Sequence, residues 1–398
     1  MTSRRHLLAA ALAGTTLGAW SRLSVAAAPV ARASTNNQRL VLLVLRGGMD
    51  GLTAVPAIGD PAFAAARGGL AAFAGEPLKL DSLFALNPLL PQMHAMYGRG
   101  ELAVLQAVGL PYRERSHFDA QQVLESGGTR PHELSTGWLG RALAGAGGLR
   151  AVALETAVPL VLRGPTEVDT WAPSALPDPS ADLVARLEAM YRGDAELSQA
   201  LARARGLRED AGMAANTPDK AGGNAYGRKA AVALATKAAE FLQRGSQVAV
   251  LDMGGWDSHA NQAAPNGATS NNLRTLDAAL AALRDGLLPG NVWGSTVVVV
   301  ATEFGRTVAV NGTQGTDHGT GGAAFVLGGA VRGGRVITDW PGLASAQRFE
   351  GRDLRITTDL RAALRGVLAD HLHIARATLD ATVLPGSAGI QPLDLLRG

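Results

Sequence analysis

The sequence predicts an α/β protein whose central, largely parallel sheet is flanked by helices. Short, continuously apolar runs have the length and composition of strands that are buried on both faces, and helix-like stretches lie between them. Strands that alternate with helices favour a doubly wound or sandwich-type domain. The apolar runs are 40–45, 102–108, 158–162, 247–251, 296–301 and 323–327, and the helix-like stretches are 88–97, 181–205, 230–244, 272–288 and 359–371.

The composition is that of a globular protein with a large core. The chain has 398 residues, of which 47% are apolar, and it contains no cysteine. A core of this size needs neither disulfides nor a metal cluster for its stability. The absence of cysteine excludes a thiol nucleophile, a zinc or iron–sulfur site with cysteine ligands, and a disulfide framework.

The N-terminus has the features of a twin-arginine export signal. Arg4 and Arg5 form a basic region, residues 7–19 form a short apolar region, and Ala31-Arg32-Ala33 is an A-x-A cleavage site. The apolar region is too short and too weakly apolar for a stable membrane span. We therefore expect the twin-arginine (Tat) translocase to export the chain to the periplasm or out of the cell. A fortuitous N-terminal helix is the alternative.

Removal of residues 1–33 changes the charge of the chain. The full sequence carries a net charge of +3, and residues 1–33 contain four arginines and no acid, so the mature chain carries +3 − 4 = −1. A chain without a basic excess is not expected to bind nucleic acid. We expect residues 34–398 to form a single α/β domain.

Two polar stretches and one helix-like stretch fall outside the alternating pattern. Residues 164–179 and 206–227 are rich in Gly, Pro or short polar side chains, which is typical of a surface excursion and a long loop. Residues 181–205 between them predict a covering helix or part of a cap. Substrate specificity would lie in these loops, and the sequence therefore names no substrate.

Acidic and histidine side chains follow several of the predicted strands. In open α/β sheets ligands bind outside the carboxyl ends of the strands, so these side chains are expected to converge. Carboxylates held so close together would repel one another without a compensating cation. Asp, Glu and His suit Zn²⁺ or Mn²⁺, whereas an all-oxygen subset would suit Mg²⁺ or Ca²⁺. The candidate metal ligands are Asp50, Asp257, His259, Glu303, Asp317 and His318.

Ser116 is the candidate nucleophile. Ser116 and Asp119 form an S-x-x-D pattern, which also predicts the N-cap of a helix that begins near His117. The two roles are compatible, because the positive field at a helix N-terminus favours an alkoxide and binds anions. Bidentate contacts to a phosphate or sulfate could come from four arginines, namely Arg46, Arg113, Arg115 and Arg306.

Motifs spread over the whole mature chain resemble the bacterial domain-of-unknown-function family 1501. That family is similar in fold to alkaline phosphatases, sulfatases and cofactor-independent phosphoglycerate mutases. Besides the export signal, the motifs are Arg46-Gly47-Gly48-Met49-Asp50-Gly51, Arg115-Ser116-His117-Phe118, Gly254-Gly255-Trp256-Asp257-Ser258-His259, Glu303-Phe304-Gly305-Arg306-Thr307 and Gly315-Thr316-Asp317-His318-Gly319.

The resemblance implies two metal sites. One would be held by Asp50, Glu303 and the Ser116 hydroxyl, and the other by Asp257, His259 and His318, with Asp317 in reserve. Two features depart from the superfamily pattern: Glu303-Phe304 stands where Asp-His is common, and the spacing from Asp257 to His259 is short. Formylglycine made from cysteine, as in many sulfatases, is impossible without cysteine, so a phosphatase-like mechanism is favoured.

The leading functional hypothesis is an exported hydrolase of small or polymer-borne phosphate or sulfate esters that depends on one or two divalent metal ions. Ser116 would attack in line, Arg115 and Arg306 would bind the anionic group, and water would then release the covalent intermediate. A non-catalytic periplasmic binding or assembly protein on the same fold is the alternative, and Phe304 favours it. A third possibility leaves Ser116 as a cap and uses a metal-activated hydroxide directly.

Overall fold

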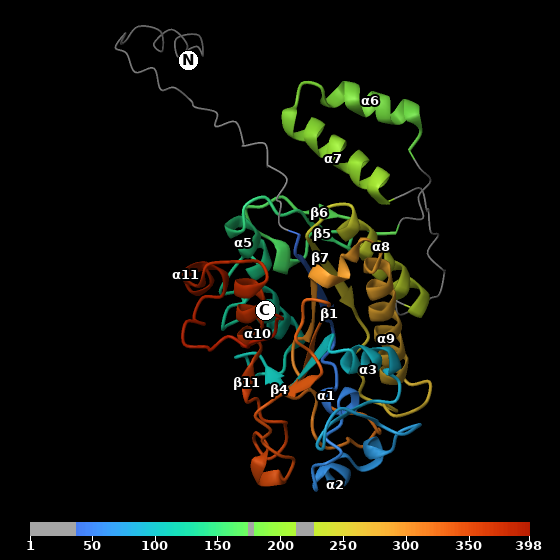
Figure 1. The fold of residues 1–398 in the computed structure, drawn as a ribbon, viewed down its shortest axis with the longest axis vertical. Helices are drawn as coiled ribbons and strands as arrows, with labels where there is room; N and C mark the ends of the chain where they lie inside the picture. The colour runs from blue at the N-terminus through green and yellow to red at the C-terminus, as the bar shows by residue number, and fades with distance from the viewer. Residues whose placement is uncertain (1–36, 174–178, 212–226) are drawn as a thin grey trace, which may run out of the picture. The chain divides into compact units, whose positions relative to one another are not determined.

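The computed structural model describes residues 37–173, 179–211 and 227–398, and these contain a large mixed sheet (Figure 1). The strand order is β10-β4-β9-β8-β1-β7-β5-β6, and β11 pairs with β4. The strands are β1 (Arg39–Leu45), β4 (Leu102–Gly109), β5 (Ala151–Ala153), β6 (Asp169–Thr170), β7 (Val248–Met253), β8 (Thr296–Thr302), β9 (Gly322–Leu327), β10 (Arg335–Ile337) and β11 (Thr358–Asp359), while β2 (Leu78–Lys79) and β3 (Ala85–Leu86) form a separate pair.

Strand β9 is the exception to parallel pairing in the centre of the sheet. It runs antiparallel to both neighbours, β4 and β8, whereas β1 pairs in parallel with β7 and β8. An antiparallel strand begins at the edge where its parallel-running neighbours end. The loop before β9 therefore meets the loops that follow β1, β4, β7 and β8.

Helices cover both faces of the sheet, as Figure 1 shows for α8 and α9 on one side and α5 and α10 on the other. Alternate residues of β1 point to opposite faces: Val41 and Leu43 pack in one core cluster, and Leu40 and Leu42 in the second. The first cluster includes residues of α1 (Gly51–Ala54), α3 (Pro91–Gly98), α8 (Arg228–Gln243) and α9 (Ala268–Leu287); the second includes residues of α4 (His117–Ser126), α5 (Trp138–Gly145) and α10 (Leu360–Asp370).

The structure confirms the predicted fold class and most of the predicted strands. The runs 40–45, 102–108, 247–251, 296–301 and 323–327 coincide with β1, β4, β7, β8 and β9. The strand expected at 158–162 is wrong: Pro159 precedes a single 3₁₀ turn at Leu160–Leu162, and the Val161 N–H donates to Glu125 Oε2 at 3.0 Å instead of to a neighbouring strand. Proline has no N–H to give to a ladder, and β5 at Ala151–Ala153 takes the place in the sheet.

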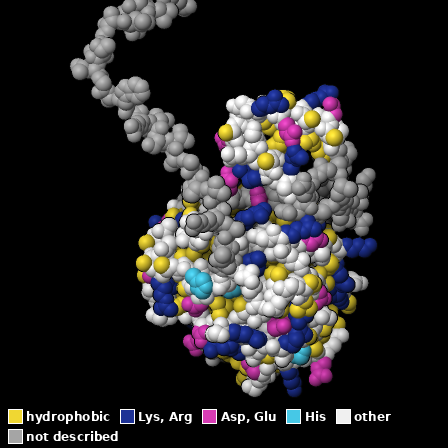
Figure 2. All heavy atoms as spheres, turned by 45° about the horizontal axis from the view of Figure 1, so that its top comes forward, with side chains coloured by type: hydrophobic (Ala, Val, Ile, Leu, Met, Phe, Trp, Pro, Cys, Tyr) yellow, Lys and Arg dark blue, Asp and Glu magenta, His cyan; other side chains and the backbone are white. Residues whose placement is uncertain are grey.

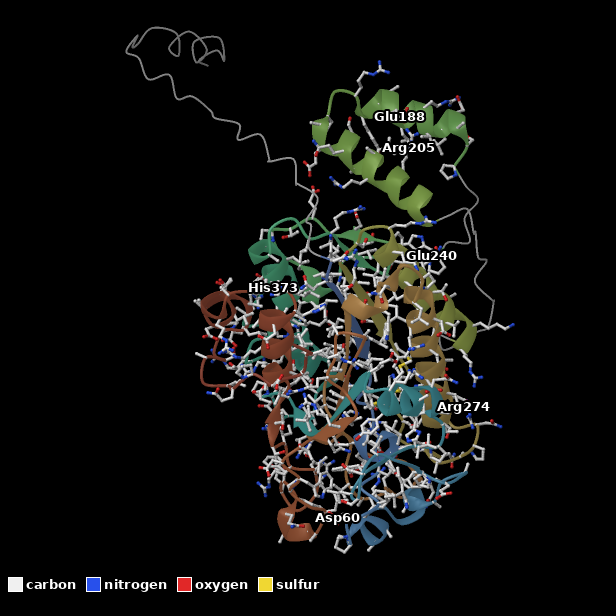
Figure 3. The ribbon with its side chains drawn as sticks, in the orientation of Figure 1. Asp60, Glu188, Arg205, Glu240, Arg274 and His373 are labelled. Carbon is white, nitrogen blue, oxygen red and sulfur yellow. The ribbon has the colours of Figure 1, made fainter. Side chains whose placement is uncertain are left out.

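The helix-like stretch at 181–205 is two helices rather than one. Helix α6 (Ala181–Tyr191) and helix α7 (Ala195–Ala211) are joined by an ion pair between Glu188 and Arg205 (Figure 3). The remaining helices are α2 (Phe63–Arg67) and α11 (Arg376–Thr378). The predicted signal at 1–33 and parts of the predicted loops, 174–178 and 212–226, lie outside the described residues.

Charged side chains of both signs are interspersed on the molecular face that Figure 2 presents. Among the helices of the described ranges, none combines the length and the apolarity that crossing a bilayer requires.

Candidate metal centre

A group of histidine and aspartate side chains lies at the edge of the sheet where β4, β7 and β8 end and β9 begins. His117 is the first residue of α4, which follows β4, and its helix starts there because Ser116 caps it. Asp257 and His259 follow β7, and His318 precedes β9. Three segments that are far apart in the sequence therefore supply one site, as the crossover topology predicts.

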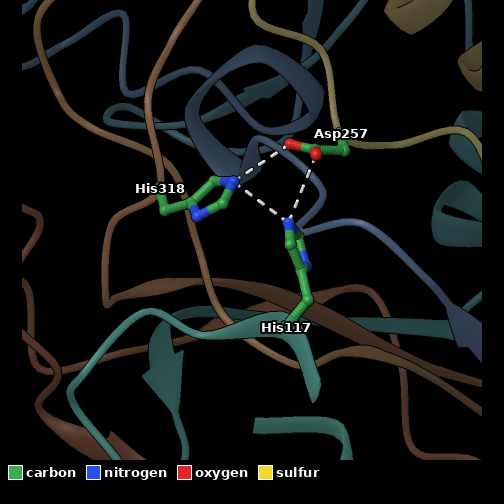
Figure 4. Close-up of side chains that lie close together, drawn as sticks. All are labelled: His117, Asp257 and His318. Atoms are coloured by element: carbon green, nitrogen blue, oxygen red, sulfur yellow. Dashed lines mark hydrogen bonds and ion pairs between the residues drawn. The ribbon is translucent and has the colours of Figure 1, made fainter. Parts of the chain in front are cut away.

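Figure 4 shows that His117, Asp257 and His318 turn their ring nitrogens and carboxylate oxygens toward one another. His318 Nε2 lies 3.0 Å from His117 Nε2 and 3.2 Å from His259 Nε2. Asp257 Oδ1 lies 2.8 Å from His259 Nε2 and 3.1 Å from His318 Nε2, and Asp257 Oδ2 lies 3.5 Å from His117 Nε2. Two ligands of a tetrahedral zinc ion with bonds of about 2.0 Å lie roughly 3.3 Å apart. The ligand atoms of His117, Asp257 and His318 all lie within 4.8 Å of one another and could hold such an ion, and His259 lies beside this set.

In the rings of His117 and His318, the partner of Nδ1 determines which ring nitrogen carries the hydrogen. His117 Nδ1 lies 2.7 Å from Glu303 Oε1, and His318 Nδ1 lies 3.0 Å from the backbone carbonyl of Arg115. Both partners are acceptors, so each Nδ1 carries a hydrogen, and Nε2 presents a lone pair in the neutral form of each ring. Two lone pairs then face each other beside the Asp257 carboxylate, an arrangement that requires a shared proton or a cation between them.

His259 is oriented in the same sense as the other two rings. Its Nδ1 lies 3.5 Å from Asp317 Oδ1, and that carboxylate also accepts a hydrogen bond from Asn311 Nδ2 at 3.1 Å. The Asn311 bond, with the nearby His259, lowers the pKa of Asp317. A carboxylate or carbonyl behind each metal-binding histidine is the usual outer shell of a zinc site, and here all three rings have one.

Glu303 is a buried carboxylate that every one of its neighbours stabilises in the charged form. Oε1 accepts from the Gly47 N–H at 2.8 Å and from Gln121 Nε2 at 3.0 Å, besides its contact with His117, and Oε2 accepts from Thr302 Oγ1 at 2.9 Å. Burial acts to raise the pKa of Glu303, but the hydrogen bonds outweigh it and lower the pKa. The bond to Glu303 in turn raises the pKa of His117.

Arg306 holds the Asp257 carboxylate in place. Its side chain is 1% exposed, and Nη1 donates to Asp257 Oδ1 at 2.8 Å. The other donors are used on the protein: Nε bonds Thr316 Oγ1 at 3.1 Å, and Nη2 bonds the carbonyls of Ser258 and Thr316 at 2.9 and 2.6 Å. Burial acts to raise the pKa of Asp257, but Arg306 and the nearby histidines lower it to about 2. Asp257 is therefore an anion at any physiological pH.

Phe304 forms an apolar support beneath two of the histidines. Its ring centroid lies 4.6 Å from that of His117 and 5.2 Å from that of His318, and the residue is 5% exposed. Burial and the charge of His117 lower the pKa of His318. Gly47 lies against the backbone of Asp257. Its φ is +118°, and a Cβ at this position would lie 2.4 Å from the Asp257 backbone nitrogen. Only glycine fits at that position.

Asp50 has a separate set of partners. It caps α1 by accepting from the backbone N–H groups of Leu52 and Thr53 at 3.0 and 3.1 Å, and it forms a buried ion pair with Arg67 at 2.5 Å. Gln262 also donates to it. Burial acts to raise the pKa of Asp50, and Arg67 and these donors lower it. Protein groups therefore compensate the charge of Asp50. The sequence analysis expected a metal ion to do so.

Ser116 serves as the predicted N-cap. The Asp119 N–H donates to Ser116 Oγ at 3.5 Å, and the helix begins at His117 as expected. Asp119 also accepts from the Tyr112 hydroxyl at 3.1 Å. Ser116 thus caps the helix and also has a side-chain hydrogen bond with Tyr112, and its role as nucleophile stays a prediction.

Arg115 reaches away from the four converging side chains. Its Nε donates to Asp353 Oδ2 at 2.8 Å and its Nη2 to Glu350 Oε2 at 2.5 Å. Its backbone has a positive φ of 62°, and its carbonyl is the partner of His318 Nδ1. The contribution of Arg115 that the structure shows is therefore the placement of a histidine ring.

His117 is the residue of this group that the sequence-based ligand set omits. The rule that chemistry follows strand ends points to the loop after β4 as well as to those after β7 and β8. Applied to that loop, the rule nominates His117 beside Ser116. Ser116, at the same helix start, is the more familiar type of nucleophile, and the signal that identifies His117 is its place directly after it.

Comparison with protein families shows which family the chain belongs to. Residues 49–365 match the family described as "Protein of unknown function (DUF1501)". The chain belongs to this family. This match confirms the resemblance to the family that the sequence motifs indicated. No curated protein matches it.

Solved structures similar to this DUF1501 chain include several ester hydrolases. A phosphonate monoester hydrolase of Agrobacterium radiobacter has a TM-score of 0.41 and 12% identity, with 90% of this chain and 78% of that chain covered. The sulfatase PsFucS1 from Pseudoalteromonas sp. has a TM-score of 0.41 and 12% identity, with 90% and 70% covered. All of these TM-scores lie below 0.5, so the function has to be inferred from the chain's own residues.

Proposed function

We propose that this chain is a metal-dependent hydrolase of anionic esters, of the phosphate or sulfate class, with its metal held by His117, Asp257, His259 and His318. One observation carries the proposal: ring nitrogens that present lone pairs lie 3.0 and 3.2 Å apart next to a charged carboxylate. A cation is the partner that compensates such a group of lone pairs and negative charge. Three nitrogen ligands and one oxygen ligand favour zinc, and manganese is second.

A divalent cation held there would supply Lewis-acid chemistry, in which an ester oxygen is polarised and water becomes a better nucleophile. The chain's own residues would prepare this chemistry. Glu303 keeps the hydrogen of His117 on Nδ1, and the Arg115 carbonyl does the same for His318, so both Nε2 atoms stay free. Arg306 fixes Asp257 through Oδ1.

The centre is accessible from solvent on one side, as a hydrolase requires. Asp257 and His259 have side chains that are 44% and 45% exposed, whereas Glu303 and Arg306 behind them are 0% and 1% exposed. A rigid, buried support below an open group of ligands is the arrangement of a binding site rather than of a core. In this proposal either Ser116 or activated water attacks the ester.

A non-catalytic binding protein is the second candidate, and one observation favours it. Four protein side chains converge, and structural zinc sites are closed by four protein ligands whereas catalytic sites keep a position open. If all four stay bound, the ion would tie the loops together without turning over an ester. Hydrolysis by the metal-loaded chain separates the two candidates.

The test is metal analysis combined with an ester panel. Protein loaded with Zn²⁺ or Mn²⁺ and passed through gel filtration should retain about one ion per chain. His318→Ala should lose most of it. His373→Ala is the matched control, because His373 contacts Gln38 outside this group (Figure 3). Retained metal with hydrolysis of aryl phosphates or sulfates supports the hydrolase. Retained metal without hydrolysis supports a binding protein with a structural ion, and no retained metal refutes the metal-dependent hydrolase.

We also propose that the chain acts in the periplasm or outside the cell after export by the twin-arginine route. The support is the Arg4-Arg5 pair with its short apolar region and A-x-A site.

A further inference from the structure

The arginine side chains around the metal centre already have acidic partners on the protein. Arg306 donates to Asp257, and its other guanidinium nitrogens donate to oxygens of the surrounding loops. Arg115 pairs with Asp353 at 2.8 Å and with Glu350 at 2.5 Å. The two arginines that the sequence analysis expected to bind the anionic group are therefore committed to acids of the chain.

The other two candidate arginines also face acids. Arg46 bonds Asp252 and lies 2.8 Å from Glu125 Oε1, and Asp359 is the electrostatic partner of Arg113. A bidentate contact to phosphate requires two parallel N–H groups that are directed at the same anion. The contacts of these arginines within the described residues instead place their charge opposite carboxylates of the protein.

The side chains that the family resemblance implies for a second metal ion are engaged elsewhere. Arg67, whose side chain is 0% exposed, supplies the positive charge beside Asp50. Both oxygens of Glu303 accept hydrogen bonds, and the Ser116 hydroxyl caps α4. Among the described residues, one group of three or more histidine and acidic side chains is spaced to hold a metal ion, namely His117, Asp257 and His318. The centre therefore fits one ion.

One acid at the centre has neither arginine nor lysine among its hydrogen-bond partners within the described residues. Glu303 lies 2.7 Å from His117 Nδ1, and its other partners are a backbone N–H, an amide and a hydroxyl. Asp257 is balanced by Arg306, and Asp317 is 54% exposed, so that water screens its charge. A divalent ion bound in front of Glu303 therefore leaves the centre with a single net positive charge.

A single positive charge favours a ligand that carries a single negative charge. The free energy needed to remove an ion from water rises with the square of its charge, whereas its attraction to one positive charge rises only in proportion. A phosphate monoester carries close to two negative charges above pH 7, because its second pKa is about 6. Phosphate diesters and sulfate monoesters carry one.

We propose that the ester bound at this centre is a tetrahedral monoanion, and that Glu303, by limiting the net positive charge to one, selects it against phosphate monoesters. The inference rests on the proposed function, because it takes the anionic group to be held at a metal ion bound by His117, Asp257, His259 and His318. Phosphate diesters and sulfate monoesters share this chemistry, and binding of their analogues distinguishes them.

The experiment measures the binding of anions that contain no ester bond. Methylphenylphosphinate and benzenesulfonate are monoanions, whereas phenylphosphonate is a dianion at pH 8.5. On zinc-loaded protein, the tighter of the two monoanions should bind about tenfold more tightly than phenylphosphonate in calorimetry. Tighter binding of the phosphinate assigns phosphate diesters, and tighter binding of the sulfonate assigns sulfate monoesters.

A variant of Glu303 tests the cause of the preference. In Glu303→Gln, with zinc at saturation, the centre carries one more positive charge, so the preference for the monoanion should fall about tenfold. The preference is a ratio of two dissociation constants on the same protein, so a general weakening of the site leaves it unchanged. Glu76→Gln, at an exposed acid, is the control and should keep the preference of the wild type.

Rates of hydrolysis keep this inference separate from the hydrolase proposal. Methyl 4-nitrophenyl phosphate or 4-nitrophenyl sulfate should be cleaved with a kcat/KM about tenfold above that of 4-nitrophenyl phosphate. The binding preference without any turnover would refute the hydrolase and leave a site for monoanions. Equal or tighter binding of phenylphosphonate, binding of none of the three anions, or an unchanged preference in Glu303→Gln overturns the charge selection. Faster cleavage of 4-nitrophenyl phosphate than of both other esters overturns it as well.

Discussion

At the scale of single residues, two buried acidic side chains serve different purposes because their partners differ. Glu303 and Asp50 are both buried acids at the ends of strands, yet Glu303 contacts a histidine and Asp50 pairs with Arg67. Both oxygens of Asp50 are taken up by Arg67, Gln262 and the cap of α1, so Asp50 has little to offer a metal ion. An acid behind a histidine orients that histidine instead. The role of each acid depends on its partner, and the partner lies outside the sequence motif that contains the acid.

Glu303→Gln should weaken metal binding without unfolding the chain. The amide cannot accept from His117 Nδ1 with the strength of a carboxylate, so the ring loses its fixed orientation. We expect a loss of about 10–100-fold in Zn²⁺ affinity, measured by competition with a chelating dye. Glu76→Gln, at an exposed acid, serves as the control. Unchanged affinity in Glu303→Gln would remove Glu303 from the outer shell.

Substitution of Ser116 separates a nucleophile from a helix cap. Ser116→Ala should cost about 1 kcal/mol of unfolding free energy, whereas Ser116→Asn preserves the cap. If Ser116 attacks the ester, both variants lose hydrolysis by orders of magnitude while metal content stays constant. If it only caps α4, Ser116→Asn hydrolyses esters like the wild type. Urea unfolding, metal content and rates on an aryl ester are the three measurements.

At the scale of elements, the ends of neighbouring strands also gather a second set of charges behind the metal centre. Arg46, after β1, bonds Asp252 of β7 and lies 2.8 Å from Glu125 Oε1 of α4. Glu155 follows β5, and burial raises its pKa to about 8 and that of Asp252 to about 6, although Arg46 opposes both shifts. Gln121 connects this cluster to Glu303 through bonds of 3.1 and 3.0 Å.

The buried acids predict that stability falls as pH rises. Their folded pKa values lie above the ordinary values of about 4, so the folded chain binds more protons than the unfolded chain between pH 4 and 8. The contribution is therefore complete at low pH, declines through this window and is lost above about pH 8. Urea unfolding at pH 5 and pH 8 should show a decline that Glu155→Gln reduces and Glu76→Gln leaves intact. An identical pH slope in Glu155→Gln would contradict the assignment.

At the scale of the whole molecule, the sheet was readable from the sequence because its strands are continuous apolar runs buried on both faces. Strand β5 at Ala151–Ala153 was missed because three residues carry no periodicity. The antiparallel direction of β9 could not be predicted either, because the apolar residues of a strand do not indicate which way the strand runs in the sheet. The edge that holds the site was predictable from the strand ends, whereas the pairing of Asp50 with Arg67 is a tertiary contact that neither motif reveals.

Export should depend on the arginine pair outside the described residues. Changing Arg4-Arg5 to Lys-Lys should leave precursor in the cytoplasm, because the transporter recognises the two arginines. Cell fractionation and immunoblotting measure the distribution, and a Lys substitution at Arg22 is the control because it lies outside the pair. Normal periplasmic yield of the double variant would rule out the twin-arginine route.

Metal binding should stabilise the whole chain, because the ligands come from loops that only the folded sheet brings together. His117 follows β4 and His318 precedes β9, so the two lie 201 residues apart in the sequence and meet at 3.0 Å only in the fold. An ion that binds the folded state alone adds about 2.7 kcal/mol to the unfolding free energy at a free concentration of 100 times its Kd. EDTA should therefore lower the urea midpoint of zinc-loaded wild type, and His117→Ala/His318→Ala should show the lower midpoint with or without EDTA. Equal midpoints for the wild type in zinc and in EDTA would show that the converging side chains hold no ion of consequence to the fold, and a shared proton would then be what separates the two ring nitrogens.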